Sequence, residues 1–94
     1  MKPEQLFQQF ETLSERLGIR LVEDKGNFIG GGCLIDKKPC IVVNKHRPIE
    51  QKLRVLASVF NELDLSSVYL MPALREYIEK VNLSLLNTQD AKKR

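Results

Sequence analysis

The strongest pattern of apolar and polar positions lies between residues 49 and 63. Its apolar residues recur at alternating intervals of four and three, which is the one-face period of an α-helix: Ile49, Leu53, Leu56, Phe60 and Leu63. At about 100° per residue, three neighbouring apolar residues widen this face to an arc of roughly 200°: Val55, Ala57 and Val59. A surface helix usually needs only about half of that arc, so we expect this helix to be covered on most sides.

Two other segments show the same helical period. A helix is predicted over residues 3–17, because Pro3 suits a first helical position and Gly18 suits a helix end. A third helix is predicted to begin at Pro72, and its apolar face has four residues at helical spacing: Leu74, Ile78, Val81 and Leu85.

Between the first two helices the pattern indicates three strands. Residues 19–25 form the first, and residues 33–36 and 40–44 form a hairpin closed by the turn Asp36-Lys37-Lys38-Pro39. The run Ile41-Val42-Val43 is apolar without interruption. Such a run is typical of a central strand with both faces covered.

The order of these elements predicts the fold class. We expect a single small α+β domain over residues 1–86, with the order α-β-β-β-α-α. Its three-stranded sheet should be mostly antiparallel, with the helices packed on it. Residues 87–94 have no periodicity and are predicted to form a disordered C-terminal tail.

Composition narrows the function classes. The chain has 94 residues, a hydrophobic fraction of 43%, a net charge of +3 and a pI near 9.0. This mild positive charge permits a nucleic-acid partner without favouring one. No apolar run reaches the ~18–20 residues of a membrane span, and the N-terminus has no signal-peptide pattern. With only two cysteines, we expect a cytoplasmic protein that does not associate with membranes.

The two cysteines are predicted to be free thiols. If Lys37 and Lys38 form the hairpin loop, Cys33 faces Val42 and lies diagonally from Cys40 at about 7–8 Å. That separation is poor for a disulfide, and a loop longer by one residue places the thiols on opposite faces. A zinc site would need further ligands, and His46 is the only histidine. We therefore expect no metal and no cofactor.

A run of three glycines precedes the hairpin. It removes side chains from about 10 Å of extended chain, which allows either a ligand or a packed element to approach the backbone. A ligand site would join this run to the basic loop before the central helix, where an anion could bind. Its residues would be Gly30, Gly31, Gly32, Lys45, His46 and Arg47. The preferred interpretation is that the glycine run makes a packing contact and that the basic loop is solvated.

The strand Ile41-Val42-Val43-Asn44 leads into a helix that follows Pro48 and contains Leu56-Ala57. This stretch resembles the zinc peptidase domains of the ImmA/IrrE type, in which a similar strand precedes a helix with His-Glu-x-x-His. The matching positions here are Ser58, Val59 and Glu62, so both histidines and the catalytic glutamate are absent. Serine is not a zinc ligand and valine cannot act as a general base. The resemblance implies a degenerate, zincin-like domain without catalytic activity.

The order helix–strand–strand–strand–helix is also similar to a double-stranded-RNA-binding domain. Such domains hold phosphates with lysines at the start of the second helix. The nearest candidates for nucleic-acid binding are Lys45, Arg47, Lys52 and Arg54. However, the paired-lysine pattern of that family is missing and a third helix is added.

The preferred hypothesis is a non-catalytic cytoplasmic interaction or regulatory domain, and not an enzyme. The chain shows no nucleophile–base pair, no metal-ligand set and no intact cofactor loop. Its partner would be an unidentified protein or a second copy in a homodimer. An edge strand at residues 19–25 or 30–36 would provide the pairing surface. RNA binding and binding of a small anion or ligand at the glycine run are the alternative hypotheses.

Overall fold

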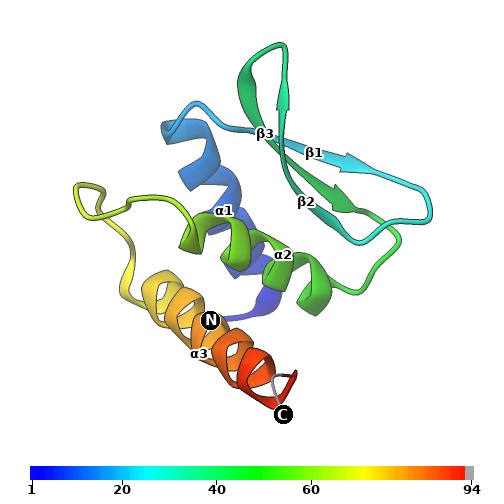
Figure 1. The fold of residues 1–94 in the computed structure, drawn as a ribbon. Helices are drawn as coiled ribbons and strands as arrows, with labels where there is room; N and C mark the ends of the chain where they lie inside the picture. The colour runs from blue at the N-terminus through cyan, green and yellow to red at the C-terminus, as the bar shows by residue number, and fades with distance from the viewer. Residues whose placement is uncertain (93–94) are drawn as a thin grey trace.

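The helices and strands follow the predicted order, and the chain belongs to the α+β class (Figure 1). In the computed structural model the backbone is described for residues 1–92 and the side chains for residues 1–83. The elements are α1 (Pro3–Arg16), β1 (Arg20–Asp24), β2 (Gly30–Ile35), β3 (Lys38–Asn44), α2 (Ile49–Asn61) and α3 (Pro72–Lys92).

The sheet has β3 in its centre, as the apolar run predicted, with β1 and β2 on its two sides. It is mixed rather than mostly antiparallel, because β1 pairs with β3 in parallel and only β2 pairs with it antiparallel. The physical reason is the route of the chain. After β1 the chain crosses to the other edge of the sheet and forms β2 there. The hairpin then places β3 between β1 and β2, and β3 runs parallel to β1.

Helix α2 is the centre of the fold. It packs against α1, α3, β2 and β3, and the ring of Phe60 stacks on that of Phe10 with 5.6 Å between centroids. Leu56, Ala57 and Phe60 are fully buried. The predicted coverage on most sides is therefore correct. The predicted helix end is not, because α2 ends at Asn61 and Leu63 lies beyond it with 41% of its surface exposed.

The helices cover only one face of the sheet (Figure 1). Ile41 and Val43 point toward them and are buried, whereas Cys40 and Val42 point to the opposite face because side chains alternate along a strand. Val42 is only half-buried. The prediction that both faces of this strand are covered thus holds on the second face for Cys40, which is buried, but not for Val42. We call this second face the open face.

The hairpin register also differs from the prediction. The turn consists of Asp36 and Lys37, both with positive φ (53° and 65°), as in a type I′ turn. Lys38 and Pro39 consequently belong to β3, and Cys33 lies directly opposite Cys40. Pro39 is tolerated there because the pairing of β3 with β1 begins only at Cys40.

The end of the chain is the last departure from expectation. Helix α3 begins at Pro72, as predicted, and buries Leu74, Ile78 and Val81. Its backbone continues as helix to Lys92, within the segment expected to be a tail. Residues 93–94 lie outside the described residues, and the limit of the domain at residue 86 stays a prediction.

Candidate functional site

Asn44 connects the two loops at one end of the sheet. Its side chain is 2% exposed, and its Nδ2 donates to the carbonyls of Gly26 (2.8 Å) and Phe28 (2.7 Å). Its Oδ1 accepts a hydrogen bond from the backbone N–H of His46 at 3.0 Å. One side chain therefore holds the segment before β2 against the turn before α2. No pattern in the sequence predicted these hydrogen bonds, although Asn44 is the polar last residue of a buried strand.

The backbone N–H groups of the basic loop, residues 45–47, donate hydrogen bonds within the protein. The N–H of Lys45 donates to the Asp24 carbonyl at 2.9 Å, and that of Arg47 donates to the Asn44 carbonyl at 3.0 Å. The N–H of His46 is occupied by the Asn44 side chain. Gly30 lies close to this loop because it pairs with Val43 at the end of β3. The glycines and the loop are thus neighbours, but the three loop amides already have protein acceptors.

Close packing requires one glycine of the run, Gly30, whereas a Cβ at Gly31 would meet nothing within 4 Å. A Cβ at Gly30, where φ is +120°, would lie 2.6 Å from the Val42 carbonyl oxygen. A Cβ at Gly32 would lie 3.4 Å from Cγ1 of Val59 on α2. Gly30 thus permits close contact with β3, whereas a Cβ at Gly32 would make only an ordinary van der Waals contact with α2. These contacts favour the packing interpretation over a ligand site.

The four candidate residues for nucleic-acid binding are not brought together. Lys52 points toward α1 and β1, where its Nζ lies 3.4 Å from the Glu23 carboxylate and 5.7 Å from the centre of the Phe7 ring. It shares a hollow of about 320 Å³ with three glutamates: Glu4, Glu11 and Glu23. Such acidic surroundings oppose phosphate binding at Lys52.

Arg54 lies on another side of α2. Burial raises the pKa of the Tyr77 phenol on α3, and the nearby Arg54 guanidinium partly offsets this effect. Since Lys52 and Arg54 are two residues apart on a helix, they point in nearly opposite directions. The side chains of Lys45 and His46 are exposed in the preceding loop and that of Arg47 is half-buried.

The positions that match the zinc-peptidase motif have other roles. The Ser58 hydroxyl donates to the Val55 carbonyl at 2.8 Å, so it bonds to the backbone of its own helix. Val59 packs against Gly32, and Glu62 caps the helix end, where it is exposed. Among the described residues, no group of three or more His, Cys, Asp or Glu could hold a metal ion.

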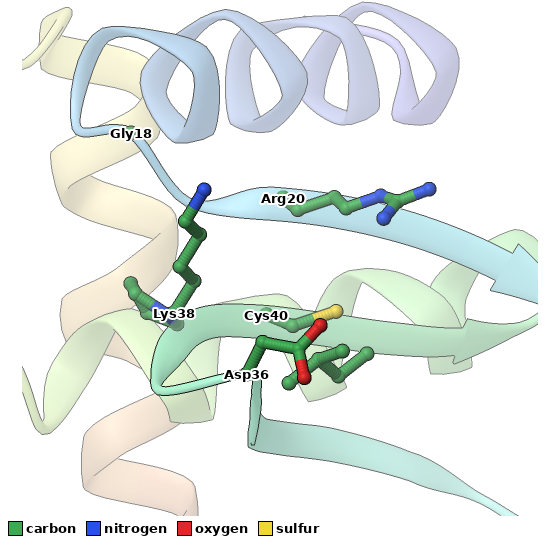
Figure 2. Close-up of a pocket in the computed structure, with 7 residues that line it drawn as sticks. Gly18, Arg20, Asp36, Lys38 and Cys40 are labelled. Atoms are coloured by element: carbon green, nitrogen blue, oxygen red, sulfur yellow. The ribbon is translucent and has the colours of Figure 1, made fainter.

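A hollow of about 210 Å³ lies on the open face at the turn end of the hairpin (Figure 2). Arg20, Lys38 and Cys40 line it, together with Asp36 and Gly18. Arg20 and Cys40 lie side by side because they are partners in the β1–β3 ladder. This group was not predicted from the sequence, because its residues come from distant segments that only the register brings together.

The two edges of the sheet differ in their side chains. Strand β1 has three charged residues among its five, whereas β2, with the sequence GGGCLI, has none. Large apolar side chains in or next to β2 are also exposed: Leu34 by 71%, Ile29 by 59% and Ile35 by 45%. Edge charges protect a sheet against pairing with another chain, so β1 is protected and β2 is not.

Comparison with known proteins gives no further assignment. No protein-family model matches the chain, and neither does any curated protein or any solved structure. The helices in the described part of the chain include none that is long and apolar enough to span a membrane.

Proposed function

We propose that the chain is a non-catalytic interaction domain of the cytoplasm that forms a homodimer by pairing β2 with β2 of a second copy. The observation that supports this function is the free edge of β2, which has no charge and has exposed apolar side chains beside it. Strand addition to such an edge supplies main-chain hydrogen bonds and is a common mode of protein recognition.

The backbone of β2 has donors and acceptors aimed at this edge. In a two-residue hairpin the pair beside the turn is hydrogen-bonded, and bonded and non-bonded pairs then alternate. Counting from the Ile35–Lys38 pair, the N–H and C=O groups of Leu34, Gly32 and Gly30 point away from β3. A second strand would satisfy these groups.

A second copy is a suitable occupant because antiparallel pairing of identical strands is self-complementary. Pairing centred on Gly32 places Leu34 of each copy opposite Gly30 of the other. The same register places Ile35 opposite Ile29, so exposed apolar side chains cover each other. The two three-stranded sheets would then form one continuous sheet.

The proposal that the chain is non-catalytic is supported by the helix positions that match the zinc-peptidase motif. Ser58 bonds to its own helix and Val59 is a packing residue, so neither is available for chemistry. A zincin-like ancestry stays a hypothesis, and the proposed dimer does not depend on it.

The test is the solution mass over a range of protein concentrations, by light scattering, for the native chain and two lysine variants. Leu34→Lys places a charge beside the pairing edge, and we expect it to shift the chain from dimer to monomer. The matched control is Tyr69→Lys, since Tyr69 is equally exposed (69%) but lies in the segment before α3. It should leave the dimer intact.

Two outcomes would contradict the proposed dimer. One is a native chain that is monomeric at every concentration. The other is a dimer whose mass is unchanged by Leu34→Lys, which would place the interface elsewhere. Circular dichroism of both variants verifies that each charge leaves the fold intact.

A further inference from the structure

The two cysteines form a pair on the open face. Cys33 in β2 and Cys40 in β3 are direct cross-strand partners, and both are free thiols. Because directly opposed residues point to the same side of a sheet, the two side chains lie next to each other. The loop between them is the tight turn of the hairpin, so their separation is fixed by the register and not by a flexible segment.

The spacing of such a pair suits a disulfide. By its place in the ladder Cys33–Cys40 is a hydrogen-bonded pair, and the Cα atoms of such pairs lie about 5.5 Å apart. Disulfides accept Cα separations of about 4.4–6.8 Å, so the bond could form without rearrangement of the strands. The Cβ atoms, however, must approach from about 4.5–5.5 Å to about 3.8 Å. This strain makes the bond easier to reduce than a typical structural disulfide.

The two thiols differ in access to solvent. Cys33 is exposed, whereas Cys40 is covered between the neighbouring strands and is 3% exposed. Burial raises the pKa of the Cys40 thiol, the neighbouring Cys33 raises it further, and the Arg20 guanidinium acts in the opposite direction. An incoming reagent therefore meets Cys33 first, and Cys40 is held beside it as the second thiol.

We propose that Cys33 and Cys40 form a dithiol site that exchanges with low-molecular-weight disulfides such as glutathione disulfide. The Cys33 thiolate attacks one sulfur of the small disulfide, which forms a mixed disulfide and releases one thiolate. Cys40 loses its proton to solvent and attacks the Cys33 sulfur, and the second small thiolate leaves. The protein loses two protons and two electrons, and the small disulfide is reduced to two thiols.

This site is independent of the proposed dimer. Pairing through β2 uses the backbone groups at the strand edge, whereas the thiols point from the open face of the sheet. The dithiol would join β2 to β3 when oxidised and leave them linked only by the hydrogen-bonded ladder when reduced.

The test is oxidation of the reduced native chain with glutathione disulfide, followed by mass spectrometry of the intact protein and of its tryptic peptides. We expect a mass lower by two hydrogen atoms and a band of unchanged size on a non-reducing gel. Cleavage at Lys25, Lys37 and Lys45 should give peptides 26–37 and 38–45 joined to each other. Dithiothreitol should restore both thiols.

The matched control is Cys40→Ser, which keeps the exposed thiol and removes its partner. We expect this variant to retain one glutathione on Cys33, whereas the native chain releases it. The proposal is overturned if the native chain also accumulates the glutathione adduct, if its thiols stay unreacted, or if the disulfide joins two chains. Each of these results decides the dithiol proposal whether or not the chain forms a dimer through its β2 edge.

Discussion

Asn44 shows how a single residue positions a large part of this molecule. Its side chain has three hydrogen-bond partners on two separate loops and is almost fully buried. Buried polar groups that lose their partners are costly, because neither water nor another protein group replaces the lost bond. Asn44 therefore determines how the segment before β2 meets the turn that leads into α2.

Replacing this residue tests its role. Asn44→Ala should lower the free energy of unfolding by about 2–4 kcal/mol, since two carbonyls and one N–H lose their partner. The measurement is urea denaturation followed by circular dichroism. Asn61→Ala is the matched control, because Asn61 is exposed and its side chain donates one hydrogen bond, to the Asn82 side chain. Its effect should be within about 0.5 kcal/mol, and equal effects for the two variants would refute the role of Asn44.

At the scale of elements, α2 and the β2–β3 hairpin determine the architecture. Helix α2 contacts the two other helices and two strands, so all of these elements pack against its apolar face in the core. The hairpin depends on its turn, because the two positive-φ residues Asp36 and Lys37 fix which residues of β2 and β3 are opposed. A turn placed one residue later would put the thiols of Cys33 and Cys40 out of register.

The central role of α2 predicts an unequal response to the loss of leucine side chains. Leu56→Ala should destabilise the fold by about 2–5 kcal/mol, because Leu56 is fully buried and its removal leaves a cavity. Leu63→Ala, beyond the end of α2, should cost less than about 1 kcal/mol, because Leu63 is 41% exposed. Thermal or chemical unfolding of the two variants measures the difference. A large effect of Leu63→Ala would mean that this residue is buried in solution, for example in an interface.

At the scale of the whole molecule, the four candidate cations for nucleic-acid binding do not gather on one surface. The net charge is +3, but Lys52 is paired with Glu23 beside two further glutamates, and Arg54 lies near Tyr77 of α3. Nucleic-acid binding depends on several cations that act on one phosphate backbone. Dispersed cations give no such surface.

This distribution predicts that RNA has little effect on the protein. Light scattering with total cellular RNA at physiological salt should give the same mass as without RNA. The variant Lys52→Glu with Arg54→Glu should give that mass too, while it loses the Lys52–Glu23 ion pair. A mass increase with RNA that disappears in this variant and at high salt would instead support the RNA-binding hypothesis.

The local patterns of the sequence determined the elements of this protein. The helical periods, the positions of Pro3, Pro72 and Gly18 and the apolar run of residues 41–43 gave the order of helices and strands. They also identified β3 as the central strand and α2 as a helix covered on most sides. Such features depend on residues close together in the chain, so the sequence contains them directly.

The tertiary structure alone decided what depends on contacts between distant segments. Examples are the parallel pairing of β1 with β3, the open face of the sheet, and the Cys33–Cys40 pair. The same holds for the hydrogen bonds of Asn44 and for the ion pair between Lys52 and Glu23. A shift of one residue in register exchanges the faces of a strand, and no local pattern here excluded that shift. The proposed β2 interface and dithiol site both follow from the register that the fold selected.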